Sequence, residues 1–211
     1  MKRALIIDDH AVVRNGLKKI LEEEPGEIEF GDAATAHEAL ELVHKQVWDI
    51  AILDISLGGG RNGLETLKEL KQRQPRLPVL ILTMHTEEQY ARRSFRSGAA
   101  GYITKDSSRA ELVRAVQKVM QGGKYVSPSL AEKLVAYIEK ESDQSPHETL
   151  SDREFQVMRL IASGKTVSEI AELISLSDKT ISTYRARILE KMRMKTNAEL
   201  THYAIRNELV D

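Results

Sequence analysis

Five polar side chains stand at the ends of short apolar segments in the first half of the sequence. They are Asp8 and Asp9 after residues 4–7, Asp54 after residues 50–53, Thr83 after residues 79–82, and Lys105 at the end of residues 101–105. Short continuous apolar runs are typical of buried parallel strands. In an open parallel sheet, ligands bind at the edge formed by the carboxyl ends of the strands. The sequence therefore predicts a site with three carboxylates, a hydroxyl and an ammonium.

These side chains suit the transfer of a phosphoryl group. Carboxylates crowded at one edge repel each other unless a cation neutralises them. Mg²⁺ fits, because it binds a few carboxylate oxygens and keeps water positions open for a phosphate, while a lysine helps to hold the phosphoryl oxygens. Asp54 is the candidate phosphoacceptor, since it is central and Asp8 and Asp9 can hold the metal beside it. Each residue taken alone is more simply a cap, a turn or a solvated charge, but their shared position at strand ends favours a site.

Strands and helices alternate through the first 125 residues. A weaker strand around Ile28 and Phe30 joins the four runs above, and helices are predicted over 12–21, 35–46 and 108–121, the last ending at Gly122. Continuous apolar strands separated by helices imply a buried parallel sheet with helices on both faces. We therefore predict an α/β domain over residues 1–125, a doubly wound, five-stranded parallel sheet of the flavodoxin-like kind.

The remaining sequence predicts a connector and a helical domain. A helix begins near Pro128 with Leu130, Leu134, Tyr137 and Ile138 on one side, and a polar, proline-interrupted segment follows over 141–148, so residues 126–149 are predicted to be a linker helix and a flexible linker. Residues 150–211 predict an all-α domain of four helices. Their predicted N-caps are Ser151, Thr166, Ser177 and Thr196, with Glu154 completing a capping box.

Charge is distributed unevenly along the chain. The net charge is only −1, yet residues 179–195 hold six cations and a single acid, Glu190. Such a local basic segment indicates contact with a polyanion; the simpler alternative is a solvated helix face. The sequence has no cysteine, no apolar run near ~18 residues and no signal peptide, so we expect a cytoplasmic protein without a membrane partner.

The predicted helices over 166–174 and 178–192 are separated by a tight turn, which is the pattern of a helix-turn-helix motif. Ile181, Ile188 and Leu189 form the predicted buried side of the second helix, which should enter the major groove. Base readout is expected from Ser182, Thr183 and Arg187. Contacts to DNA phosphates are expected from Lys165, Thr166, Lys179, Arg185 and Lys191, and Thr180 belongs to the same DNA-binding set.

Residues 3 to 123 resemble the receiver domain of two-component response regulators. The resemblance rests on the segments Ile7-Asp8-Asp9-His10, Leu53-Asp54-Ile55, Leu82-Thr83, Gly98-Ala99-Ala100-Gly101-Tyr102 and Lys105-Asp106. It implies a histidine kinase that donates phosphate to Asp54, contacts from Thr83 and Lys105 to the phosphoryl group, and an aromatic switch at Tyr102. It further implies Mg²⁺ on Asp9, Asp54 and the backbone carbonyl of Ser56, with Asp8 acting mostly through water. Such a chain is no enzyme, although it assists its own phosphoryl transfer and dephosphorylation.

Two departures from the receiver pattern are visible. The loop after Asp54, through residue 63, is one residue longer than usual and lacks the proline four residues after the acceptor. Asp106 replaces the usual proline after Lys105, which removes the reason for a cis peptide bond there. Neither departure removes a reacting group.

Residues 150–211 resemble the four-helix DNA-binding domain of the LuxR/NarL/FixJ type. The matching segments are Leu150-Ser151-Asp152-Arg153-Glu154, Ile161-Ala162-Ser163-Gly164-Lys165, Glu169-Ile170-Ala171, residues 177–184, Leu189-Glu190-Lys191-Met192 and Asn197-Ala198-Glu199-Leu200. The whole chain thus resembles a two-component response regulator of the NarL/FixJ family. This implies a sensor histidine kinase and promoter DNA as partners, and a homodimer that forms on phosphorylation or DNA binding.

The predicted fourth helix of the second domain bears on dimerisation. Leu200, Tyr203, Ala204 and Ile205 give it more apolar surface than a small three-helix core is expected to bury. Part of this face is therefore predicted to pair two DNA-binding domains on adjacent half-sites. In the resting monomer the receiver is expected to cover this face or the recognition helix; the alternative is a simple tether with no occlusion.

Three other functions fit the sequence less well. Haloacid-dehalogenase-like phosphatases need an Asp-x-Asp pair on the first strand, whereas Asp8 and Asp9 are adjacent and the acceptor candidate follows the third strand. A protein-interaction module without DNA function does not explain the basic segment. Gly58, Gly60 and Gly63 match the dinucleotide pattern G-x-G-x-x-G, but this pattern belongs in the first strand-helix turn.

Overall fold

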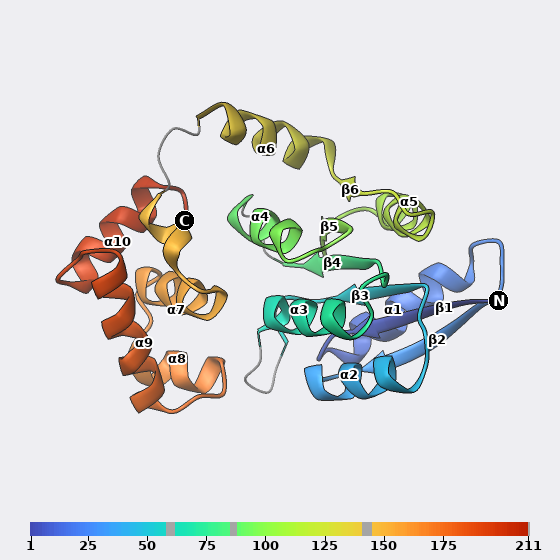
Figure 1. Ribbon diagram of the computed structural model, residues 1–211, viewed down its shortest axis with the longest axis horizontal. Helices are drawn as coiled ribbons and strands as arrows, with labels where there is room; N and C mark the ends of the chain where they lie inside the picture. Colours follow the sequence, from blue (N-terminus) through green and yellow to red (C-terminus); the bar gives the residue numbers. More distant parts are fainter. Residues whose placement is uncertain (58–61, 85–87, 141–144, 211) are drawn as a thin grey trace. The chain divides into compact units, whose positions relative to one another are not determined.

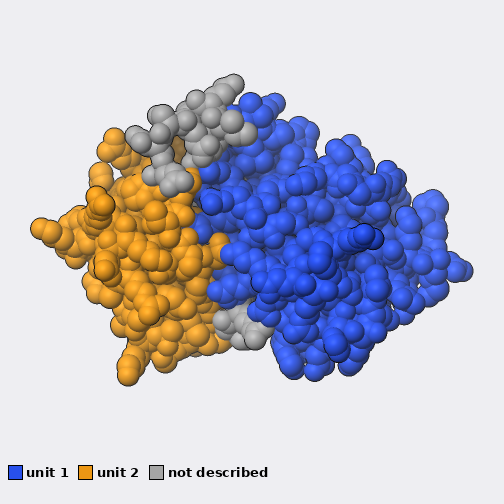
Figure 2. Space-filling view, viewed as in Figure 1, with its two compact units in different colours: residues 1–138 blue, residues 139–211 orange. Residues whose placement is uncertain are grey.

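The computed structural model describes residues 1–57, 62–84, 88–140 and 145–210. For residues 136–140 it describes the backbone alone. Gly58 and Gly60 of the glycine-rich loop, the middle of the predicted linker and the side chains of Tyr137 and Ile138 lie outside the described residues. The chain forms two compact units, residues 1–138 and 139–211, coloured separately in Figure 2. In the described part of the chain, no helix is long and apolar enough to cross a membrane.

The first unit contains a parallel sheet in the order β2-β1-β3-β4-β5-β6 (Figure 1). The strands are β1 (Lys2–Ile7), β2 (Ile28–Ala33), β3 (Ile50–Leu53), β4 (Val79–Thr83), β5 (Gly101–Thr104) and β6 (Tyr125–Val126). Every residue of β3 and β4 is buried, as expected for strands covered on both faces. The order reverses between β1 and β3, which makes the carboxyl ends of these strands the place where a ligand binds.

Helices cover both faces of this sheet. They are α1 (Ala11–Glu22), α2 (Ala36–Lys45), α3 (Gly63–Arg73), α4 (Glu88–Arg96) and α5 (Arg109–Met120), and α6 (Pro128–Lys140) follows β6. Leu17 and Leu21 of α1 and Leu112 and Val116 of α5 belong to one buried core with Ile52 of β3. On the other face α3 contacts both α2 and α4. The predicted doubly wound α/β fold is therefore confirmed.

The predicted number of strands is wrong, because the sheet has six strands and not five. The sixth strand is only two residues long, and the backbone N–H of Tyr125 donates to the carbonyl of Ala100 at 3.0 Å. Its register places Val126 opposite Tyr102. A strand of only two residues shows no hydrophobic periodicity, so the sequence pattern could not separate this edge strand from the connector. The described peptide bonds are all trans, including the one that precedes Asp106.

The second unit is helical. It contains a short 3-10 helix η1 (Pro146–Thr149) and the helices α7 (Asp152–Ala162), α8 (Val167–Leu173), α9 (Asp178–Lys191) and α10 (Asn197–Arg206). The hydroxyls of Ser151, Thr166, Ser177 and Thr196 cap α7 to α10 in turn, as the sequence predicts, and the caps of α7 and α8 are full capping boxes. The core is formed by fully buried side chains, among them Phe155, Val157, Ile170, Ile181, Ile188 and Leu200.

The apolar face of α10 is more completely buried than the sequence suggests. Leu200 and Ala204 are fully buried, and α10 packs chiefly against α7. The hydroxyl of Tyr203 lies 2.7 Å from Nδ1 of His147 in η1, a segment that the sequence assigned to the linker. Only Ile205 of the four predicted residues is strongly exposed, at 56%. The surplus apolar surface on α10 is thus reduced to Ile205, because α7 covers most of the face and His147 of η1 contacts Tyr203.

Candidate functional site: an acidic edge and a basic helix

Three of the predicted site residues meet at the carboxyl edge of the sheet. The ammonium of Lys105, after β5, lies 2.7 Å from Oδ2 of Asp8 and 2.6 Å from Oδ2 of Asp54. Both carboxylates are buried, each with 2% of its residue surface exposed. Burial acts to lower the pKa of Lys105, but the hydrogen bonds and negative charges of Asp54 and Asp8 outweigh burial and raise the pKa above its ordinary value. Lys105 is therefore a cation that holds two buried anions together.

The local backbone fixes the carboxylate of Asp54. Its Oδ1 accepts a hydrogen bond from the backbone N–H of Ser56 at 3.0 Å, while Oδ2 faces Lys105. The start of α3 packs directly behind this segment, since a β-carbon on Gly63 would clash with the carbonyl oxygen of Asp54. Asn62 caps α3 through its side-chain oxygen. The last glycine of the G-x-G-x-x-G segment therefore serves close helix–strand packing at Asp54.

Asp9 and His10 extend the acidic cluster toward solvent. Nδ1 of His10 lies 2.8 Å from Oδ1 of Asp9 and 3.3 Å from Oδ1 of Asp8. Single ligand atoms of these three residues lie within 4.8 Å of one another, close enough to hold one metal ion. Two buried carboxylates, Asp8 and Asp54, and a partly exposed one, Asp9, give an oxygen-rich set that fits a hard cation such as Mg²⁺. The sequence placed His10 only in a motif; its position next to two acids was the available signal.

Thr83 and Tyr102 lie on neighbouring strands but are not directly opposite. Thr83 pairs in register with Thr104, and Tyr102 pairs with Ile81. Both Thr83 and Tyr102 are buried, and the carbonyl of Thr83 accepts the backbone N–H of Lys105 at 2.8 Å. Tyr102 also lines a cavity of about 210 Å³ against the first turns of α6, where Leu130 is buried. Thr83 thus belongs to the acidic edge, and Tyr102 lies between the sheet and α6.

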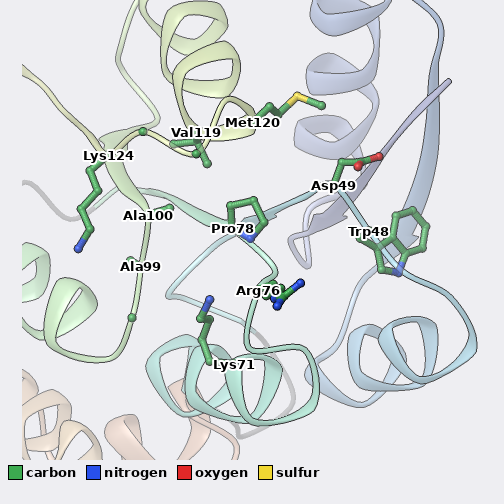
Figure 3. A pocket seen from close by; sticks show the side chains of 13 residues that line it. Trp48, Asp49, Lys71, Arg76, Pro78, Ala99, Ala100, Val119, Met120 and Lys124 are labelled. Atoms are coloured by element: carbon green, nitrogen blue, oxygen red, sulfur yellow. The ribbon is translucent and has the colours of Figure 1, made fainter.

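A larger cavity, of about 460 Å³, lies at the opposite edge of the sheet, before the first residues of β3 to β5 (Figure 3). Figure 3 shows Lys71 of α3 extending toward Pro78, with Lys124 and Asp49 on opposite sides of the space. The ammonium of Lys71 donates to the carbonyls of Pro75 and Leu77, and burial lowers its pKa. This cation satisfies carbonyl groups of the loop that follows α3. The acidic edge therefore remains the candidate reaction site.

The second unit presents the predicted helix-turn-helix motif. Helices α8 and α9 are joined by a turn in which Ser175 has a positive φ of 53°. Ile181 and Ile188 bury one side of α9, and Leu189 is half-buried beside them. Side chains exposed on the helix are Lys179, Ser182, Thr183 and Arg187, and Lys165 and Thr166 are exposed at the start of α8. One surface of the motif is thus free of core contacts and carries hydroxyls and cations.

Several of the expected DNA contacts also have partners within the domain. The hydroxyl of Thr183 donates to the carbonyl of Lys179, Thr180 shares a hydrogen bond with the Ser177 cap, and Nε of Arg185 donates to Asn197. Lys191 forms an ion pair with Glu154 of α7 at 2.6 Å. Ser182 and Arg187 are exposed and have no such bond among the residues that the structure describes. The Lys191–Glu154 pair spans 37 positions, so no local pattern reveals it.

Both halves of the chain match known families. A model of the response regulator receiver domain matches residues 4–117, and a model of the bacterial regulatory proteins of the luxR family matches residues 148–204. The chain is 35% identical to the response regulator UvrY of Escherichia coli (strain K12) over 210 residues, which cover 99% of this chain and 96% of UvrY. It is 34% identical to the response regulator GacA of Pseudomonas aeruginosa over 212 residues, which cover all of this chain and 99% of GacA.

Solved structures agree with this assignment. A LuxR-family two-component response regulator from Aurantimonas sp. SI85-9A1 is 34% identical with a TM-score of 0.61, covering 65% of this chain and 98% of that protein. RcsB from Salmonella enterica serovar Typhimurium, bound to the promoter rprA in the presence of the phosphomimetic BeF3-, is 25% identical with a TM-score of 0.59, covering 96% of this chain and 98% of RcsB. The chain therefore belongs to the NarL/FixJ family of two-component response regulators, in which a receiver domain is joined to a LuxR-type DNA-binding domain.

Proposed function

We propose that this response regulator is a transcription factor whose binding to promoter DNA is controlled by phosphorylation of Asp54. The observation that carries the proposal is the contact of Lys105 with two buried carboxylates, Asp8 and Asp54, at the carboxyl edge of a parallel sheet. A structural ion pair needs one anion for each cation, whereas this arrangement leaves an excess of negative charge at an edge that binds ligands. The similarity to RcsB, which was solved on promoter DNA with a phosphomimetic, supports the same use here.

In the proposed reaction an oxygen of the Asp54 carboxylate attacks the phosphorus of a phosphohistidine on a sensor histidine kinase. The new O–P bond forms as the P–N bond breaks, and the imidazole nitrogen keeps the electron pair and takes a proton. Lys105 exchanges its contact with Asp54 for one with a phosphoryl oxygen, which limits the build-up of negative charge. Hydrolysis reverses the state: water attacks the phosphorus, and inorganic phosphate and the free Asp54 carboxylate result.

Asp8, Asp9, Asp54 and the backbone carbonyl of Ser56 are the proposed Mg²⁺ ligands. The bound ion would neutralise charge on the transferring phosphoryl group. Asp8 is already held by Lys105, while Asp9 is partly exposed and its side chain contacts only His10 within the described part of the chain. Asp9 is therefore the carboxylate best able to turn toward an incoming cation, and Asp8 is suited to act through water.

The proposed output is a change in DNA binding. Thr83 would contact the phosphoryl group and Tyr102 would follow it as the aromatic switch, since both are buried on adjacent strands. The change would favour a homodimer, relieve occlusion of the DNA-binding unit, or do both. Such a protein acts in the cytoplasm, and it is not an enzyme beyond assisting transfer to and from its own aspartate.

The proposed DNA surface is the exposed side of α9 with the start of α8. Ser182, Thr183 and Arg187 would read base edges. The contacts to phosphates would come from Lys165, Thr166, Lys179, Arg185 and Lys191, with Thr180 close to the backbone at the N-terminus of α9. Arg185 and Lys191 must first exchange their internal partners, Asn197 and Glu154, for phosphate oxygens.

Phosphorylation can be tested by intact-mass measurement. The full-length protein is incubated with Mg²⁺ and a small phosphodonor such as acetyl phosphate, beside the Asp54→Asn and Asp9→Asn variants. We expect one phosphoryl group on the wild type, none on Asp54→Asn, and strongly reduced labelling of Asp9→Asn. Labelling of Asp54→Asn to the same extent as the wild type would refute Asp54 as the acceptor.

A further inference from the structure

Asp8 is bound at each of its backbone and side-chain polar groups. Its N–H donates to the carbonyl of Ala33 at 3.1 Å, Oδ1 accepts the N–H of His10 at 2.8 Å, and Oδ2 faces Lys105 at 2.7 Å. The remaining group, the backbone carbonyl of Asp8, accepts a hydrogen bond from Nη1 of Arg14 at 2.7 Å. Arg14 is the one partner in this set that binds through its side chain and that the site does not otherwise use.

The topology explains why that carbonyl needs a side-chain donor. Strand β1 ends at Ile7, and the neighbouring β2 ends at Ala33, which is already paired with the N–H of Asp8. After these residues both segments turn away from the sheet, so the carbonyl of Asp8 has no backbone partner on the neighbouring strand. Arg14, in the first turns of α1, reaches back to supply the missing donor. A buried carbonyl without a donor would cost stability and would let the peptide rotate.

Arg14 is an unusual choice for a purely structural donor. It is half-buried, its Nε is enclosed without an acceptor, and it makes no ion pair within 4.0 Å among the described side chains. Enclosing part of a guanidinium without a carboxylate costs free energy. Its position next to the peptide that joins Asp8 to Asp9 gives a reason for that cost.

We propose that Arg14 is a positioning residue for the acidic edge. It fixes the Asp8–Asp9 peptide, and through it the direction of the two carboxylates that would bind Mg²⁺. This consequence rests on the proposed function, because it concerns the same metal. A nearby cation acting by charge alone would repel Mg²⁺, so its removal would tighten binding. Positioning predicts the opposite sign, since loss of an outer partner of a ligand typically weakens metal affinity by roughly 10–100-fold.

The test uses full-length protein and two substitutions of similar length. Arg14→Met keeps the aliphatic bulk but removes the donor and the charge, whereas Arg14→Lys keeps a donor. Lys19→Ala, on an exposed position of the same helix, controls for loss of a positive charge. Mg²⁺ titration by calorimetry should give a dissociation constant about tenfold higher for Arg14→Met, close to the wild type for Arg14→Lys, and unchanged for Lys19→Ala. Phosphorylation of Arg14→Met should recover when Mg²⁺ is raised to saturation.

A metal-free measurement separates this inference from the proposed function. The backbone ¹⁵N resonance of Asp9 reports the hydrogen bond to the preceding carbonyl, so it should move in Arg14→Met and return in Arg14→Lys. If the wild type binds no Mg²⁺, the proposed function fails while this resonance still reports the Arg14 bond. An unchanged or lower Mg²⁺ dissociation constant in folded Arg14→Met would overturn positioning. If Arg14→Met does not fold, Arg14→Lys provides the test. An Asp9 resonance that is shifted in Arg14→Lys, together with a Mg²⁺ affinity equal to that of the wild type, would also overturn positioning.

Discussion

Replacing Lys191 by methionine separates a structural role of this residue from a role in DNA binding. Lys191 pairs with Glu154 at 2.6 Å, and the Glu154 side chain is only 4% exposed whereas that of Lys191 is 43% exposed. A hydrogen bond to a charged group contributes roughly 1.5–3 kcal/mol. Because Lys191 is well solvated, we reduce this to about 1–2 kcal/mol for the loss of stability. The DNA-binding unit of Lys191→Met should therefore unfold more easily even without DNA.

The pH dependence of this effect has a definite sign. Burial acts to raise the pKa of Glu154, but the hydrogen bond from Lys191, the bonds from Ser151 and the charge of Lys191 together lower the pKa below its ordinary value of 4.5. The folded-state pKa is thus below the unfolded one. The stabilisation is complete above pH 4.5 and is lost as the pH falls through the folded-state pKa. The difference between wild type and Lys191→Met should be full at pH 7 and should shrink as the protein is acidified below 4.5.

Hydrogen exchange of the α7 amides in the full-length protein measures this stability without separating the units. Arg187→Met is the matched control, because Arg187 is exposed on the same helix and has no bond within the described chain. We expect faster exchange in Lys191→Met at pH 7 and no change in Arg187→Met. Exchange at the wild-type rate in both variants would show that the Lys191–Glu154 pair does not stabilise the unit and that Lys191 is available for DNA alone.

Thr83→Ala should still gain a phosphoryl group by intact mass but lose the response in DNA affinity, and a normal response would exclude Thr83 from the switch. Arg185→Ala should weaken binding to all duplexes and lower the slope of log affinity against log salt concentration by about one. Thr183→Ala should instead change the preference at one base pair by ~1–3 kcal/mol. Titrations of specific and random duplexes at several salt concentrations distinguish the two variants, and equal effects of both on all sequences would refute these roles. Gly63→Ala should destabilise the receiver by about 1–3 kcal/mol, since its β-carbon meets the Asp54 backbone. Gly16→Ala, with open space around it, should instead stabilise α1 by about 0.5–1 kcal/mol. Urea unfolding followed by the fluorescence of the single tryptophan, Trp48, measures both, and an unchanged stability of Gly63→Ala would contradict the packing argument.

The sequence predicted the acidic edge because its information is local. Apolar runs that end in Asp8, Asp54 and Lys105 define both the strands and the side chains at their ends, and parallel pairing then brings the ends together. The helix starts of the second unit were equally accessible, since a cap such as Ser151 and its partner Glu154 lie three residues apart.

What the sequence did not predict depends on partners distant in the chain or on very short elements. Strand β6 has two residues and no period. The burial of α10 depends on its packing against α7 and on the contact of Tyr203 with His147, and the Lys191 ion pair depends on Glu154; these are contacts between separate helices. Arg14 is close in sequence to Asp8, yet its bond is to a backbone carbonyl, and a residue type alone does not show which carbonyl is left unpaired at a strand end.

The central claim is that phosphorylation of Asp54 controls DNA binding, and one comparison tests it directly. The affinity of the full-length protein for a promoter fragment identified by gel shift is measured with and without Mg²⁺ and acetyl phosphate, for the wild type and for Asp54→Asn. We predict tighter binding by the phosphorylated wild type and no change in the variant. Equal affinity of the phosphorylated and unphosphorylated wild type, or an equal response in Asp54→Asn, would contradict the account.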